Sequence, residues 1–191
     1  MALPNANGID LFTINPDGTI LEAKTPYLSD TGPFSVAVDA AGTVLYSANA
    51  GSGAGSVSAF TISAADGSLT AICTPTPCVS AIPIPANNDL GIDPEGKYLF
   101  VTEGNTKGAL GVFPIDKSSA TGLDAEVAGS PFTAGNTPNS VGFDPLGQFV
   151  YVPNDGSMNV SQFKLNSTNP VLTPIGSPVG GGNGPDFIAV Y

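Results

Sequence analysis

Short apolar runs separated by turn residues recur along the chain, and three stretches repeat one pattern. In each stretch an apolar run leads to Asp, a four-residue turn that ends in Gly, and a second apolar run. The three copies read VAVDAAGTVLYSANAG, LGIDPEGKYLFVTEGN and VGFDPLGQFVYVPNDG. They place Asp39, Asp93 and Asp144 in register at intervals of roughly 50 residues, a period that is typical of propeller blades.

Each of these Asp residues opens a turn between two apolar runs, which we name strands A and B. The turns read DAAG, DPEG and DPLG. Asp at the first position accepts hydrogen bonds from nearby backbone N–H groups, Pro presets the next φ, and Gly suits the last position. We therefore interpret the three Asp residues as turn residues. The alternative, acid–base catalysis, explains the Asp but not the Gly that accompanies it.

A third strand, C, follows each hairpin and carries an aromatic residue in a fixed place. The segments are SVSAFTI, ALGVFPI and NVSQFKL, and the N-terminal GIDLFTI matches them. Phe60, Phe113, Phe163 and Phe12 share one register position, which suits packing between blades better than it suits a binding stripe. A fourth strand, D, is clearest in NPDGTILEA and AADGSLTAI.

Four antiparallel strands that repeat in this way predict an all-β propeller made of four-stranded blades. We expect one domain over the whole chain, with complete blades at about residues 34–82, 88–134 and 139–180 and a partial blade from 5–23 plus 184–191. The terminal pieces supply strands A, C and D but no strand B. We therefore expect a half-propeller or a subunit, completed by self-association or by another chain at its two ends.

Composition and charge exclude two classes of partner. The chain has 24 Gly and 18 Pro, and only 11% of its residues are charged, which fits turns and short strands. Its 16 acidic residues face five lysines, with no arginine and no histidine. A nucleic-acid partner is excluded because phosphates require a cationic face. No apolar run is long enough for a membrane span.

The only two cysteines, Cys73 and Cys78, lie in CTPTPC. They form a poor zinc site, because zinc requires four ligands and the chain has no histidine. We expect a local disulfide, with two free thiols as the alternative. Disulfides persist in oxidising compartments, and the low charge agrees, so we expect an extracellular, cell-surface or periplasmic location.

Oxygen atoms are the remaining ligands, because without histidine neither a Ser-His-Asp arrangement nor a histidine-bound metal is available. We therefore assign no catalytic residue. The register places one residue at the end of each strand B, and two acidic residues lie just before strand A. These candidate calcium ligands are Asn49, Glu103, Asn154, Asp89 and Asp186. Calcium, the only cofactor we consider, needs such residues to converge; the alternative is that each caps its own loop.

Two families resemble the repeat. The strand-B pieces YSAN, FVTE and YVPN, each after D-x-x-G, resemble the Tyr-Val-Thr-Asn repeats of surface-layer and secreted propellers. The joints GSPFTAGNTPNS and GSPVGGGNGPDF resemble those of lactonase-type seven-bladed propellers, of which this chain would be about half. The resemblance covers nearly the whole chain and implies an architecture that many functions share.

The lactonase resemblance also implies hydrolysis of a sugar lactone, and for the best-known substrate class a phosphorylated one. The chain departs from that substrate, because phosphate recognition favours arginine and this chain has none. We therefore expect no hydrolysis of phosphogluconolactone. A neutral sugar lactone opened by a calcium-activated water is compatible with the residues present.

Three functions follow from the sequence. We favour an extracellular propeller that acts as a binding or structural and assembly module. The first alternative is a calcium-dependent sugar-lactone hydrolase, and the second is a subunit of a surface layer or extracellular filament. Calcium-dependent activity on a panel of lactones separates the hydrolase from the others, and the mass in solution separates the subunit from the isolated module.

Overall fold

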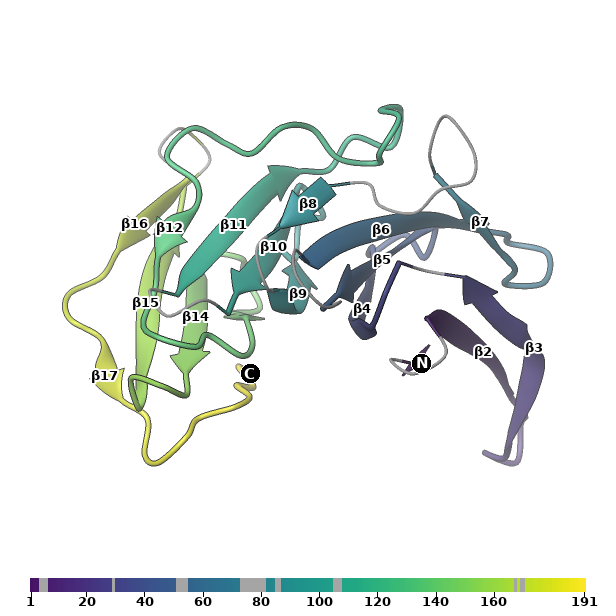
Figure 1. Ribbon diagram of the computed structural model, residues 1–191, viewed down its shortest axis with the longest axis horizontal. Helices are drawn as coiled ribbons and strands as arrows, with labels where there is room; N and C mark the ends of the chain where they lie inside the picture. The colour runs from purple at the N-terminus through teal and green to yellow at the C-terminus, as the bar shows by residue number, and fades with distance from the viewer. Residues whose placement is uncertain are drawn as a thin grey trace.

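The structure is a computed structural model, and it describes the chain except for residues 4–6, 29, 51–54, 73–81, 85–86, 105–107, 167 and 169–170. Four antiparallel sheets follow one another along an arc (Figure 1). The strands β4 (Pro33–Val38) and β9 (Asn87–Ile92) lie in the middle of this arc. The predicted all-β propeller architecture is confirmed. A search of the described residues for a helix long and apolar enough to cross a membrane finds none. Cys73 and Cys78 lie outside the described residues.

The N-terminal sheet and blade 1 come first along the chain. The N-terminal sheet has the order β1-β2-β3, with β1 (Ala2–Leu3), β2 (Gly8–Ile14) and β3 (Ile20–Leu28). Blade 1 has the order β4-β5-β6-β7, and β8 also pairs with β6. Its strands are β4 (Pro33–Val38), β5 (Val44–Asn49), β6 (Gly55–Ile62), β7 (Leu69–Ala71) and β8 (Ile82–Ile84).

Blades 2 and 3 repeat this arrangement, each with its inner strand first. Blade 2 consists of β9 (Asn87–Ile92), β10 (Tyr98–Glu103), β11 (Ala109–Pro114) and β12 (Phe132–Thr133). Blade 3 consists of β13 (Gly142–Phe143), β14 (Phe149–Asn154), β15 (Asn159–Leu165), β16 (Leu172–Pro174) and β17 (Val179–Gly180). After β17 the described tail, 181–191, runs without further strands.

The turn role of the repeated Asp residues is confirmed. The Asp39 carboxylate accepts hydrogen bonds from the backbone N–H groups of Thr43 (2.6 Å) and Val44 (2.8 Å). Gly42, within the turn, has a φ of 67°, a left-handed value that favours glycine. Asp93 and Asp144 accept the equivalent bonds at the start of β10 and β14. These bonds fix where each strand B begins.

Blade 2 is linked to the first of these turns by an ion pair. The Lys117 ammonium lies 2.5 Å from a carboxylate oxygen of Asp39 and donates to Thr43 Oγ1 at 2.8 Å. Burial alone would raise the pKa of Asp39, but the hydrogen bonds from Lys117 and from the turn outweigh it and lower this pKa to about 2. The carboxylate is therefore charged at neutral pH and joins two blades.

The aligned phenylalanines pack between the sheets, as the register predicts. Phe60 shares a buried cluster with Ile9 of the N-terminal sheet. Phe113 lies in the cluster between blades 1 and 2, and Phe163 lies in the cluster between blades 2 and 3. Phe12 holds the same position in the N-terminal sheet but is 36% exposed. The packing role therefore holds in blades 1, 2 and 3, each of which packs against the sheet before it in the chain. It does not hold for Phe12 in the N-terminal sheet, before which the structure describes no other sheet.

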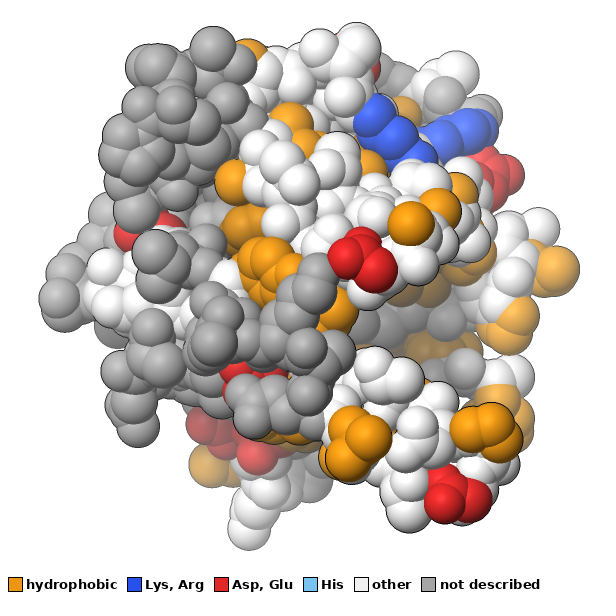
Figure 2. Space-filling model, turned by 90° about the vertical axis from the view of Figure 1, so that its right-hand side faces the viewer, with side chains coloured by type: hydrophobic (Ala, Val, Ile, Leu, Met, Phe, Trp, Pro, Cys, Tyr) orange, Lys and Arg blue, Asp and Glu red, His pale blue; other side chains and the backbone are white. Residues whose placement is uncertain are grey.

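The N-terminal sheet leaves apolar side chains at the surface. Ile14, Ile20 and Leu21 are each more than half exposed. Figure 2 looks onto this end of the arc and shows hydrophobic side chains at the surface among polar ones. This sheet also contains a strand that the repeat did not predict. β1 pairs Ala2 with Ile9 and Leu3 with Gly8, so it lies in the place of strand B.

Candidate functional site

In all three blades the inner strand begins at the end of the molecule where strand B stops. Pro33 pairs with Asn49 and Asn87 pairs with Glu103. An isolated bridge joins Pro138 to Asn154 in blade 3. In a propeller the inner strands surround the central axis, and residues at one end of them come from different blades but face a common space. The predicted strand-B residues therefore lie at the end where a ligand site can form.

Asp89 ties three neighbouring inner segments together. Its carboxylate accepts a hydrogen bond of 2.5 Å from Ser35 Oγ of β4. Burial raises the pKa of Asp89, and its interactions with Ser35, the Leu90 and Val141 backbone and Ser140 oppose that rise. Since Ser35 belongs to blade 1 and Val141 to blade 3, this one carboxylate holds the inner strands of three blades in place.

A hollow of about 190 Å³ opens where the inner segments begin, and we name it the inner hollow. It is lined by Phe34, Asn139, Asp186 and Phe187. Asn139 Nδ2 donates a hydrogen bond of 2.7 Å to Asp186 Oδ1, which fixes the orientation of this exposed carboxylate. The rings of Phe34 and Phe187 are 61% and 81% exposed. Exposed aromatic rings beside an oriented polar group are typical of a ligand site.

The sequence predicted one of these four residues, Asp186, and missed the others. Asn139 was detectable, because it holds the same place before strand A in NSVGF as Asp186 holds in DFIAV. Phe34 holds that place in blade 1, where it lies within β4, and Phe187 follows Asp186 directly. The alignment of strand A, in place of the aromatic position of strand C, would have indicated Phe34, Asn139 and Asp186, but not Phe187.

Asn49 and Asn154 make the local hydrogen bonds of the alternative interpretation. Asn49 Nδ2 donates to Ser58 Oγ at 2.9 Å. Asn154 Nδ2 donates to Ser161 Oγ at 3.0 Å, and its Oδ1 accepts from the Gly135 backbone N–H at 3.0 Å. Both side chains are buried. These amides join strand B to strand C in blades 1 and 3.

Glu103 occupies the equivalent position in blade 2 and differs in chemistry. The residue is 5% exposed. Burial, with a smaller contribution from the charge of Glu126, raises the pKa of Glu103 to about 7. Within the part of the chain that the structure describes, its carboxylate receives no hydrogen bond, and no group of three or more Asp, Glu, Cys or His is placed to hold a metal. Calcium binding by the five candidate ligands stays a prediction.

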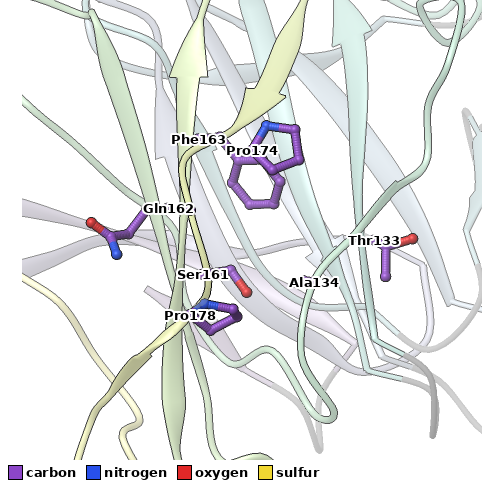
Figure 3. Close-up of a pocket in the computed structure, with 8 residues that line it drawn as sticks. Thr133, Ala134, Ser161, Gln162, Phe163, Pro174 and Pro178 are labelled. Carbon is purple, nitrogen blue, oxygen red and sulfur yellow. The ribbon is translucent and has the colours of Figure 1, made fainter.

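A second hollow of about 190 Å³ lies at the outer edge, between blades 2 and 3 (Figure 3). It forms where strand D of blade 3 is interrupted between β16 and β17. The ring of Phe163 faces Pro174 there, whereas Gln162 points away to the other side of the strand (Figure 3). Phe163 is buried as core. This hollow therefore results from the break in strand D, and no charged side chain among the described residues lines it.

Comparisons with known proteins agree on the fold. The family described as lactonase, 7-bladed beta-propeller, matches residues 2–188. None of the curated proteins matches the sequence. A candidate 6-phosphogluconolactonase from Bacteroides uniformis superposes with a TM-score of 0.78 at 19% identity, over 95% of this chain and 51% of that chain.

Two further solved structures show how widely the fold is shared. The periplasmic gluconolactonase of Pseudomonas aeruginosa gives a TM-score of 0.65 at 17% identity, over 88% of this chain and 51% of that one. The hydrazine synthase of Kuenenia stuttgartiensis gives 0.55 at 17% identity, over 97% of this chain and 72% of that one. This chain spans about half the length of both lactonase structures.

Proposed function

Since the chain belongs to the lactonase, 7-bladed beta-propeller family, we propose that it forms part of a sugar-lactone hydrolase whose substrate binds in the inner hollow. The family match and the lactonase neighbours favour this function over the binding or structural module that the sequence alone favoured. The observation that carries the proposal is the inner hollow itself, where Asp186 is oriented beside two exposed rings.

The lining of the inner hollow suits an uncharged sugar lactone. Phe34 and Phe187 offer apolar ring faces on which the C–H face of a sugar ring can pack. Asn139 and Asp186 offer an amide and a carboxylate to its hydroxyl groups.

Two of the lysines form ion pairs with acidic residues of the D-x-x-G turns: Lys97 with Glu95, and Lys117 with Asp39. With no arginine in the chain, a phosphate group on the substrate lacks its preferred partner.

Asp186 is proposed as the general base. A water molecule attacks the lactone carbonyl carbon and gives a proton to the Asp186 carboxylate, which Asn139 holds in place. The ring C–O bond then breaks, the ring oxygen takes up a proton, and the product is the open hydroxy acid.

A hydrolysis assay with and without a chelator tests whether calcium takes part. The proposed calcium ligands are the five predicted from the sequence: Asn49, Glu103, Asn154, Asp89 and Asp186.

Hydrolysis of gluconolactone by the 191-residue chain, measured above the spontaneous rate, tests the proposal. Asp186→Asn should lower kcat/KM by about 100-fold, and Phe187→Ala should raise KM. Asp124→Asn removes an exposed acidic residue from blade 2 and should leave the rate unchanged. Absence of both binding and hydrolysis, or an unchanged rate in Asp186→Asn, would contradict the proposal. Faster turnover of 6-phosphogluconolactone would contradict the neutral substrate.

We also propose that the chain works with a second copy or another chain, in the periplasm or outside the cell. The exposed apolar side chains Ile14, Ile20 and Leu21 at the N-terminal sheet support such a contact. The location is supported by the Pseudomonas neighbour, which is a periplasmic protein. The mass in solution tests the first part, and titration of free thiols at Cys73 and Cys78 tests the oxidising compartment.

A further inference from the structure

The last residue of strand B and the residue of strand C two positions beyond its pairing partner form a repeated polar pair, and blade 2 departs from it. In blade 1 the pair is Asn49 with Ser58, and in blade 3 it is Asn154 with Ser161. The same register positions in blade 2 hold Glu103 and Gly111. We call these three sites the B–C pairs. The comparison isolates a chemical change in an otherwise repeated backbone.

The change removes a hydrogen-bond donor and adds a charge. In blades 1 and 3 an amide Nδ2 donates to a serine hydroxyl, so both polar groups are satisfied. An ionised glutamate only accepts hydrogen bonds, and glycine has no hydroxyl to offer it. Glu103 is nine-tenths buried and has no hydrogen bond to its carboxylate among the described residues. An ionised carboxylate on a side chain this deeply buried loses hydration, which a bound cation can restore.

The space above Gly111 is filled by a second carboxylate. A Cβ atom at residue 111 would lie 3.1 Å from Glu103 Oε1 and 3.2 Å from Glu126 Oε1, so both oxygens face this one small space. Glu126 is held there, because Ser130 Oγ donates to its Oε1 at 3.0 Å and itself accepts from the Val112 N–H at 2.9 Å. The fold therefore directs two carboxylate oxygens into the same small space, which the ring edge of Phe113 also borders.

Two carboxylates that share one small space repel each other when both are ionised, and a cation between them removes this repulsion. Lys97 and Lys117 are paired with Glu95 and Asp39. We propose that Glu103 and Glu126 bind a divalent cation, Ca²⁺, whose remaining ligands are water. Carboxylate oxygens are the ligands that Ca²⁺ prefers, and Glu126 is exposed, so water can complete the coordination.

This cation site differs from the five-residue calcium set in position and in partners. It shares only Glu103 with that set, and it lies within blade 2, between β10 and the segment that follows β11. The proposal is independent of lactone hydrolysis, because neither carboxylate lines the inner hollow. Its expected effect is to stabilise blade 2 with the modest affinity of extracellular calcium modules, in the range of about 10⁻⁴ to 10⁻³ M.

Calcium titration of the chelator-treated 191-residue chain tests the proposal, with calorimetry for binding and thermal unfolding for stability. We expect one bound Ca²⁺ and a rise in Tm of a few degrees at millimolar Ca²⁺, because a ligand that binds only the folded state stabilises it. Sodium chloride at equal ionic strength should give no comparable rise. An unchanged Tm and no binding heat would overturn the proposal.

Two variants assign the effect to these residues. Glu126→Gln removes an exposed charge, and the double variant Glu103→Asn with Gly111→Ser copies the pair of blades 1 and 3. Both should fold and lose the calcium-dependent rise in Tm, whereas Asp124→Asn should keep it. Persistence of the rise in Glu126→Gln and in the double variant would place the cation elsewhere and refute the assignment. Lactone hydrolysis measured on the same variants keeps this test separate from the proposed function.

Discussion

Blades 1 and 3 contain a neutral B–C pair, whereas blade 2 contains a carboxylate at the same place in the same backbone. Asn49 and Asn154 use their amides to join strand B to strand C. Glu103 ends its strand in the same register but faces Gly111 and Glu126. The comparison shows that the repeat fixes where a buried polar side chain lies, and that the residue facing it determines what that side chain can bind.

The sharpest test of this comparison replaces each strand-B residue with leucine. Asn154→Leu leaves the Gly135 N–H and the Ser161 hydroxyl without their partner, so the free energy of unfolding should fall by about 3 kcal/mol. Glu103→Leu, measured in chelator, removes a buried carboxylate without a described donor and should cause little or no loss.

Urea unfolding of the two leucine variants provides the measurement, and Asn49→Leu serves as the control for blade 1. We expect Asn49→Leu to resemble Asn154→Leu, because the repeat gives it the same serine partner in strand C. If Glu103→Leu lost as much stability as Asn154→Leu, the distinction between the blades would be wrong.

The pH dependence of stability provides the second test. The folded-state pKa of Glu103 is about 7, above its ordinary value of 4.5. The stability that comes from the protonated form is therefore fully present below pH 4.5 and is lost as the pH rises through 7. In chelator, the free energy of unfolding should fall by the order of 2 kcal/mol between pH 5 and pH 8.

The double variant Glu103→Asn with Gly111→Ser isolates this contribution. Burial also raises the pKa values of Asp89 and Asp93, and both changes act in the same direction, but these residues are unchanged in the double variant. The difference between the two pH profiles therefore reports blade 2 alone. Parallel profiles for the chain and the double variant would show that folding does not change the pKa of Glu103.

The sequence predicts the local features of this fold well, because each has a local cause. Asp39 and its equivalents were placed by turn chemistry, and Phe60 and its equivalents by the spacing of strand C. The turn residues play the predicted role, and so do the aligned phenylalanines of the three blades, whereas Phe12 is partly exposed. The ends of strand B were located for the same reason, since their positions follow from the turns.

The features that the sequence did not predict depend on contacts between distant segments. Glu126 lies in a weak copy of strand D, where the Val127 N–H donates to the Val112 carbonyl just as Ile72 donates to Ala59 in blade 1. Blades 1 and 3 have no carboxylate at this place, so the approach of Glu126 to Gly111 appears only in the folded chain. The inner hollow combines Phe34 with Phe187, from opposite ends of the sequence. β1 escaped notice because it contains two residues and has no turn pattern before it.

The N-terminal sheet extends the comparison to a fourth position and provides the smallest predicted effect. β1 pairs Ala2 with Ile9 as β5 pairs Ala48 with Val57, which places Asp10 at the register of Ser58. Asp10 is 9% exposed, and among the described residues its Oδ1 has no hydrogen-bond partner. A buried acceptor of this kind destabilises the folded state. Asp10→Ser should therefore raise the free energy of unfolding by about 1 kcal/mol, measured by urea unfolding, whereas Asp10→Asn keeps an acceptor oxygen and should gain less. A loss of stability in Asp10→Ser would show that this carboxylate has a partner that blades 1 and 3 lack.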